Sequence, residues 1–89
     1  MKSIRITVYG KVQGVWYRAS TQKQAQALEI VGWVRNLSDG SVTMEATGTA
    51  QALVLFEGWC RQGPLHARVD RLEKEEIPLQ DYQDFQIIR

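Results

Sequence analysis

The sequence predicts a small α+β sandwich, in which two helices cover one face of an antiparallel sheet. Apolar and polar residues alternate over residues 3–9, which indicates a half-buried strand. Two stretches with helical spacing, at about residues 19–30 and 49–62, lie on either side of a predicted hairpin. The resulting order, β-α-β-β-α-β with a short last strand, is typical of the split β-α-β, ferredoxin-like fold. We expect residues 1–89 to form a single domain.

The first helix is expected to run from about residue 19 to about residue 30. Thr21-Gln22-Lys23-Gln24 has the pattern of a capping box, and an earlier start near Arg18 is the alternative. Thr21, Ala25 and Leu28 share one face at spacings of four and three. Because these side chains are small, the helix should lie close to the sheet.

A hairpin should follow, with strands at residues 32–37 and 41–47. Between them, Ser38-Asp39-Gly40 is a turn signal, because Asp-Gly readily supplies the positive φ angles of hairpin turns. The period of two places Val34 and Asn36 on the same face of the first of these strands. Asn36 thus lies at the end of a strand, just before the turn.

The second helix should begin after Thr49, a favourable N-cap residue, and end at Gly63-Pro64. Its apolar stripe consists of Leu53, Phe56 and Cys60, flanked by Ala52 and Trp59. Strands are expected at residues 67–77 and 85–88, which completes the sheet.

Composition narrows the range of functions. The net charge of +1 gives no reason to expect a nucleic-acid or membrane partner. Cys60 and His66 are the only residues of their types, so no internal disulfide and no metal site built from Cys and His can form. The charged N-terminus does not resemble a signal peptide, and no apolar run reaches membrane-spanning length. We expect a cytoplasmic monomer without metal or cofactor.

The loop between the first strand and the first helix has the features of an anion cradle. It runs from Gly10 to Arg18 and contains two glycines and no proline, so every residue keeps its N–H donor. The start of the following helix adds further unpaired donors and a positive dipole end. Arg18 can hold a phosphate through two parallel hydrogen bonds. The alternative is a surface loop that ends in a solvated arginine.

Three motifs in this order resemble the acylphosphatase family. They are Val12-Gln13-Gly14-Val15-Trp16-Tyr17-Arg18, then Gly32-Trp33-Val34-Arg35-Asn36, then Asp39-Gly40-Ser41-Val42. The later Gly63-Pro64, with Ala67 and Val69, fits the same pattern, so the resemblance covers essentially the whole chain. It implies the ferredoxin-like fold described above.

The resemblance also implies site residues. Arg18 would bind the substrate phosphate, and Asn36 would position the attacking water. Backbone donors would come from the loop before the helix, with Gln13, Gly14, Val15, Trp16, Tyr17 and Arg18 forming the phosphate-binding segment. For Asn36 the alternative is an ordinary turn residue.

For several charged and tryptophan residues, the sequence leaves more than one structural role open. Glu29 stands where the family has a glycine, which leaves the end of the first helix uncertain. Trp59 is expected in the core, whereas Trp16 and Trp33 either flank the site or cover the sheet edge. Lys11 and Arg35 either raise the local positive potential or are simply solvated; no role is assigned to any of these side chains.

We therefore expect an acylphosphate phosphohydrolase, which converts a small acyl phosphate and water into a carboxylate and phosphate. A carboxylate leaving group, with a conjugate-acid pKa of about 4, needs no general acid. One alternative is a non-enzymatic ferredoxin-like module that binds phosphate or RNA, although the RNP1 pattern is absent. Another is a module of a larger carbamoyl-phosphate-handling protein. The end of the chain directly after the last strand favours a stand-alone enzyme.

Overall fold

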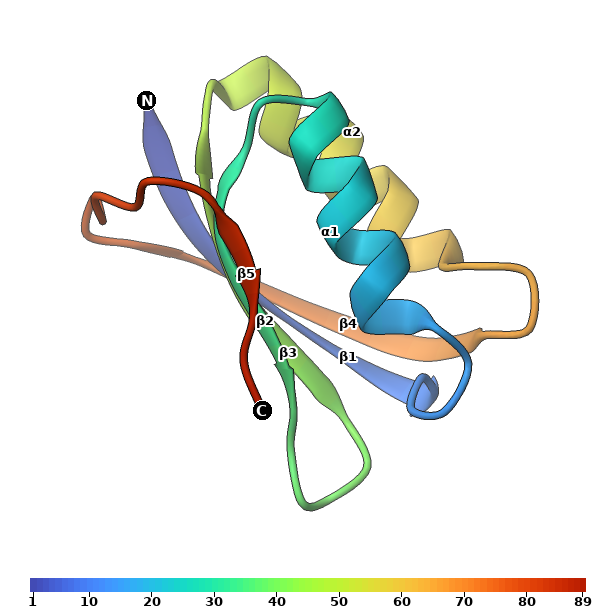
Figure 1. The fold of residues 1–89 in the computed structure, drawn as a ribbon. Helices are drawn as coiled ribbons and strands as arrows, with labels where there is room; N and C mark the ends of the chain where they lie inside the picture. Colours follow the sequence, from blue (N-terminus) through green and yellow to red (C-terminus); the bar gives the residue numbers. More distant parts are fainter.

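The computed structural model describes all residues, 1–89, and has one five-stranded sheet with two helices (Figure 1). The elements are β1 (Lys2–Lys11), α1 (Tyr17–Ala27), β2 (Val31–Asn36), β3 (Val42–Gly48), α2 (Ala50–Gln62), β4 (Arg68–Ile77) and β5 (Phe85–Ile87). Both helices lie on the same face of the twisted sheet, as the predicted fold class requires. Neither helix has the length and apolar character needed to cross a bilayer.

The strand order is β4-β1-β3-β2-β5, and the four long strands pair antiparallel. The last strand differs from the expected antiparallel sheet, because β5 pairs parallel to β2. The connection of residues 78–84 carries the chain from the β4 edge of the sheet to the opposite edge before β5 begins. The sheet is therefore mixed, and its one parallel edge brings the C-terminal residues beside β2.

The core lies between the sheet and the helices. Ile6, Val8, Met44 and Phe56 are fully buried, and the predicted stripe of α2 faces this layer. Thr49 caps α2 as predicted, since its hydroxyl accepts a hydrogen bond from the Ala52 N–H at 3.1 Å. These contacts hold the helices in a fixed position relative to the sheet.

The start of α1 differs from the capping-box prediction. The helix begins at Tyr17, close to the alternative start near Arg18, and Trp16 occupies the cap position without a side-chain cap hydrogen bond. The Thr21 hydroxyl instead donates to the Tyr17 carbonyl at 2.7 Å, inside the first turn. Thr21 thus lies inside the helix and is buried, and because its hydroxyl bonds to the carbonyl four residues earlier it does not act as an N-cap.

The end of α1 also differs, because the helix stops at Ala27 and not near residue 30. Glu29 has a φ of 57°, a left-handed conformation that glycine usually adopts at this position. The Glu29 N–H donates to the Gln26 carbonyl at 3.2 Å, and the Ile30 N–H donates to the Ala25 carbonyl at 2.8 Å. This pair of bonds is a Schellman motif, so the chain turns out of the helix despite the missing glycine.

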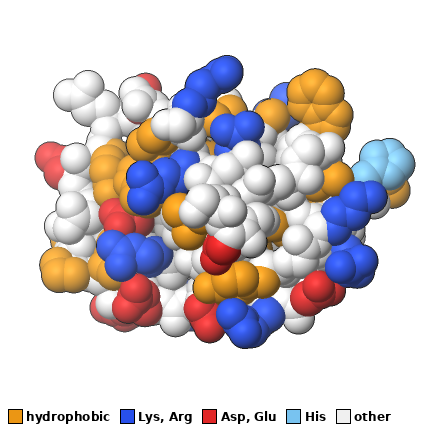
Figure 2. Space-filling view, turned by 90° about the horizontal axis from the view of Figure 1, so that it is seen from below, with side chains coloured by type: hydrophobic (Ala, Val, Ile, Leu, Met, Phe, Trp, Pro, Cys, Tyr) orange, Lys and Arg blue, Asp and Glu red, His pale blue; other side chains and the backbone are white.

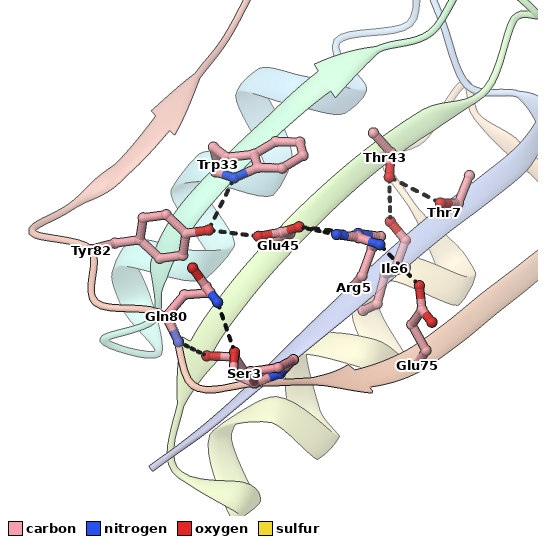
Figure 3. A network of polar contacts seen from close by, with 11 residues as sticks. Ser3, Arg5, Ile6, Thr7, Trp33, Thr43, Glu45, Glu75, Gln80 and Tyr82 are labelled. Carbon is pink, nitrogen blue, oxygen red and sulfur yellow. Dashed lines mark hydrogen bonds and ion pairs between the residues drawn. The ribbon is translucent and has the colours of Figure 1, made fainter.

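The face of the sheet without helices carries a polar network (Figure 3). Glu45, in the middle of β3, accepts hydrogen bonds of 2.6 Å from both Arg5 and Tyr82, and Tyr82 accepts one from Trp33 at 3.2 Å. Burial by itself would raise the pKa of Glu45, but the hydrogen bonds from Tyr82 and Arg5 hold it below its usual value.

The same network holds the connection between β4 and β5. The Gln80 N–H donates to the Ser3 hydroxyl at 2.8 Å (Figure 3). The Thr47 hydroxyl donates to the Gln80 carbonyl at 3.1 Å. Together with Tyr82, these bonds fix residues 78–84 to the sheet. The path of this connection determines where β5 and the residues after it lie.

Replacing Glu29 with glycine should stabilise the protein. A left-handed residue other than glycine costs roughly 1–2 kcal/mol, and glycine offsets part of this gain through its greater freedom in the unfolded chain. We expect the free energy of unfolding of Glu29→Gly to rise by about 1 kcal/mol, which corresponds to about 4–8 °C in Tm for a domain of this size. Thermal unfolding followed by far-UV circular dichroism measures this. The matched control is Glu76→Gly, in an exposed strand position, which should lower Tm. An unchanged or lower Tm for Glu29→Gly would show that Glu29 is not strained.

Candidate active site

The loop between β1 and α1 has unpaired backbone donors and the backbone geometry of an anion-binding loop. Gly14 and Trp16 both have left-handed conformations, with φ angles of 74° and 65°. No protein acceptor is hydrogen-bonded to the backbone N–H groups of residues 14–18. Alternation of left-handed and right-handed residues directs successive N–H groups to one side, a geometry that binds anions. At Gly14 an added Cβ would meet no atom within 4 Å, so it is the φ angle that favours glycine there.

Three side chains anchor this loop in the core. Val12, Val15 and Tyr17 are buried, although they flank or lie within an irregular segment. The Tyr17 hydroxyl donates to the Cys60 carbonyl in α2 at 2.7 Å. Burial raises the pKa of Tyr17, so this phenol stays protonated and acts as a donor. The first turn of α1 is therefore tied to the second helix.

Gln13 connects the loop to the β2–β3 hairpin. Its side-chain amide donates to the Leu37 carbonyl at 2.8 Å and to the Ser41 carbonyl at 2.9 Å. These two carbonyls belong to the base of the hairpin turn, directly after Asn36 in the chain. Gln13 was predicted from the sequence to belong to the phosphate-binding segment, but its anchoring role was not, because the residues it joins lie far apart in the chain.

Asn36 is the last residue of β2 and faces the helix side of the sheet. Its neighbour on that face, Val34, is fully buried, which confirms the shared face expected from the sequence. The Asn36 side-chain oxygen is buried and accepts no hydrogen bond within the protein. A buried unpaired acceptor costs free energy unless a ligand or water satisfies it. Asn36 thus has a hydrogen-bonding capacity that the fold does not use.

Arg18 lies in the first turn of α1. It takes part in none of the ion pairs of the structure, although most of the charged residues of the sheet do. A cation at a helix N-terminus is unfavourable because the helix dipole is positive there. An anion bound between Arg18 and the loop donors would remove this repulsion.

A pocket of about 400 Å³ joins these parts. It is lined by Val12, Gly14, Trp16, Tyr17, Arg18, Ala19, Asn36, Ile87 and Arg89. Two guanidinium groups and no carboxylate side chain are among these residues, which makes the pocket electropositive. Figure 2 views the molecule from this end and shows basic side chains beside exposed hydrophobic ones, with the acidic side chains mostly in the lower part.

Ile87 and Arg89 line the pocket but were not predicted from the sequence. They reach the pocket because Ile87 pairs with Val34 in the parallel β2–β5 ladder, and the Ile88 N–H donates to the Val34 carbonyl at 2.9 Å. The chain therefore continues along β2 toward Asn36. No local pattern in the sequence signals this register, since it depends on the connection across the sheet.

Other candidates lie away from the pocket. Lys11 and Arg35 do not line it, and Arg35 instead lies over the Trp33 ring at 5.5 Å on the opposite face of the sheet. Trp59 packs against Tyr17, with ring centroids 5.6 Å apart.

Burial raises the pKa of the Cys60 thiol to about 12, so this residue is a core side chain and a poor nucleophile. No group of three or more His, Cys, Asp or Glu residues could hold a metal ion.

The fold and the pocket define a ferredoxin-like α+β protein with an electropositive site large enough for a phosphate and a small organic group. A family model described as acylphosphatase matches residues 4–87. The chain therefore belongs to the acylphosphatase family, which confirms the resemblance seen in the motifs.

Individual relatives agree with this assignment. An acylphosphatase from Legionella pneumophila (strain Corby) is 46% identical over 96% of this chain and 93% of its own length. The structure of an acylphosphatase from Coxiella burnetii superposes with a TM-score of 0.95 at 41% identity, covering 98% of this chain and 92% of that one. The acylphosphatase structure from Bacillus subtilis has a TM-score of 0.97 at 33% identity and covers both chains completely. The match thus extends over nearly the full length of each relative.

The anchoring role of Gln13 gives a testable consequence. Gln13→Glu keeps the size of the side chain but replaces the amide donor with a carboxylate, which cannot donate to the Leu37 and Ser41 carbonyls. Because each lost hydrogen bond is worth about 1 kcal/mol net, inhibition by inorganic phosphate should weaken by about tenfold or more. Competitive inhibition constants measure this. Gln22→Glu is the matched control, since it removes an amide donor to the Phe85 carbonyl elsewhere on the molecule. Equal phosphate inhibition in Gln13→Glu and wild type would contradict the anchoring role.

Proposed function

We propose that this acylphosphatase holds the phosphate of its substrate with Arg18 and the backbone of residues 13–18, and that Asn36 positions the attacking water. The hydrolysis of acyl phosphates follows from the family. The residue roles rest on one observation: a single pocket joins the unpaired N–H donors, an unpaired guanidinium and an unpaired buried amide oxygen. Each of these groups lacks a partner within the protein.

Binding the phosphate is the first requirement. Phosphoryl transfer depends mainly on positioning and on stabilising the charge of the transferred group. The N–H groups of residues 14–18 and the Arg18 guanidinium supply donors that do not need to reorganise during the reaction. Arg89 adds positive potential from the other wall of the pocket.

The second requirement is the orientation of water. The oxygen of an amide accepts a hydrogen bond from water, and its nitrogen can donate to a phosphoryl oxygen. The buried oxygen of Asn36 is suited to the first task because no protein group competes for it. A water held there would direct a lone pair toward the phosphorus atom, opposite the departing carboxylate.

The chemistry of the leaving group explains why the pocket needs no general acid. No Asp, Glu or His lines it, so no side chain there can serve as a general acid near neutral pH. A carboxylate, whose conjugate acid has a pKa of about 4, departs without protonation. An alkoxide does not, and phosphate monoesters should therefore react poorly.

Further properties belong to the same proposal. We infer that residues 1–89 act as one domain, that the protein works as a cytoplasmic monomer, and that it needs neither a metal ion nor a cofactor.

The RNA-binding alternative gains no support, because the open face of the sheet carries the carboxylates of Glu45, Glu73 and Glu75 close to Arg5. Carboxylates on this face would repel a nucleic-acid backbone.

The proposal is tested by comparing two substrates. The protein should hydrolyse benzoyl phosphate rapidly and p-nitrophenyl phosphate at least about a hundredfold more slowly, with excess EDTA present in both assays. Activity that disappears with EDTA and returns with Mg²⁺ or Zn²⁺ would overturn metal independence. Comparable rates for the two substrates would overturn the account of the leaving group.

Variants of Arg18 and Asn36 should behave differently. Arg18 contacts the phosphate before and during the reaction, so Arg18→Ala should raise KM, weaken phosphate inhibition and lower kcat. Arg18→Lys should restore little, because an ammonium cannot form the bidentate fork. Asn36→Ala should lower kcat on the order of 10²–10³, by analogy with losing one oriented polar group, while phosphate inhibition stays near wild type.

The measurements are kcat, KM and the phosphate inhibition constant for each variant, with far-UV circular dichroism to confirm folding. Arg35→Ala, one residue before Asn36 but outside the pocket, is the matched control. Wild-type kcat in folded Asn36→Ala would make Asn36 a turn residue. Normal phosphate inhibition in folded Arg18→Ala would refute its role in phosphate binding.

A further inference from the structure

Trp16 combines three properties that are rarely found together. Its side chain is 78% exposed, it lines the pocket, and its φ of 65° is a left-handed conformation that bulky residues seldom adopt. A large apolar ring on the surface does not contribute to the core, and a left-handed tryptophan is unfavourable for folding. A contribution of the Trp16 side chain to the stability of the fold therefore does not explain why a tryptophan occupies this position.

The other tryptophans show what an engaged ring looks like. Trp33 donates to the Tyr82 hydroxyl and lies under Arg35, and Trp59 packs against Tyr17 and the core. Trp16 forms no aromatic pair, no cation–π contact and no indole hydrogen bond within the protein. Its ring is free to contact a ligand in the pocket.

The walls of the pocket are of two kinds. Polar groups come from the N–H donors of the loop, Arg18 and Asn36, whereas five lining side chains are apolar: Val12, Trp16, Tyr17, Ala19 and Ile87. Val12 and Tyr17 are almost fully buried, and Trp16 is the most exposed large side chain of the five. An acyl group is attached to its phosphate through a single oxygen, so it must lie within a few ångströms of the phosphate site. Because Trp16 belongs to the same loop as the N–H groups proposed to bind the phosphate, its ring is within reach of the acyl group.

We propose that the Trp16 ring is the binding platform for the acyl group, and that it makes the enzyme prefer acyl phosphates with aromatic or flat apolar acyl groups. This inference rests on the proposed function, since it concerns the second half of the same pocket. Contact between a flat acyl group and the indole buries apolar surface and permits offset stacking of the two π systems. A small acyl group such as acetyl covers little of the ring and gains little from it.

The test compares benzoyl phosphate with acetyl phosphate in wild type, Trp16→Asn and Trp16→Tyr. Asparagine tolerates the left-handed conformation, so Trp16→Asn removes the ring without straining the loop. The ratio of kcat/KM for benzoyl phosphate over acetyl phosphate should fall roughly tenfold in Trp16→Asn, as expected when an aromatic stacking partner is removed. It should stay within about threefold of wild type in Trp16→Tyr, which keeps a ring. Changes in the backbone of the loop affect both substrates alike, so the ratio isolates the contribution of the ring.

Binding without turnover provides an independent readout. Phenacylphosphonate and acetonylphosphonate, in which a CH2 group replaces the bridging oxygen of benzoyl phosphate and acetyl phosphate, should show the same loss of discrimination in their inhibition constants. Leu79→Ala, which removes an exposed apolar side chain away from the pocket, is the control and should leave both ratios unchanged. Equal effects of Trp16→Asn on both substrates would overturn the inference while acyl phosphate hydrolysis stands. Hydrolysis of neither substrate by the wild type would overturn the proposed function itself.

Discussion

The pocket depends on the conformation of five successive peptide groups between β1 and α1. Gly14 and Trp16 adopt left-handed conformations within a segment that then enters a helix, a backbone geometry that directs successive N–H groups to one side. An isolated chain would not keep this arrangement, since the tryptophan conformation is unfavourable and the donors would prefer water. The surrounding fold therefore has to impose it, and much of the structure near the site can be understood as doing so.

The conformation of the loop is imposed from two directions. Val12, Val15 and Tyr17 bury their side chains in the core, so the loop cannot lift away from the sheet without exposing them. Gln13 fixes the opposite side of the loop to the hairpin that follows Asn36. The position of the donors relative to the Asn36 amide is thereby determined by rigid elements. Such preorganisation is what a reaction controlled by positioning and charge requires.

Local patterns predicted the parts of the fold that are determined locally. The order of elements, the Asp-Gly turn, the Thr49 cap and the shared face of Val34 and Asn36 depend on residues a few positions apart, and the structure confirms them. The start of α1 near residue 19 and its end near residue 30 were wrong, whereas the alternative start near Arg18 is close to the observed Tyr17. Thr21 lies inside the helix and is buried, and Glu29 adopts a conformation that usually needs glycine. The parallel β5 and the presence of Arg89 in the pocket were not predicted, since they depend on a connection fixed by Ser3, Thr47 and Tyr82 across the sheet.

The central claim is that one anion site joins the loop donors, Arg18 and Asn36. A titration of the ¹⁵N-labelled protein with inorganic phosphate, followed by ¹H–¹⁵N correlation spectra, tests it most directly. The backbone amides of residues 14–18, the Arg18 side-chain N–H and the Asn36 side-chain amide should all shift along one binding curve. The amides of Glu75, Glu76 and Ile77, at the end of β4 that pairs with the start of β1, should not respond. Loop amides that stay unchanged while phosphate binds, or shifts that instead cluster at Arg5 and Lys74 on the open face of the sheet, would contradict it.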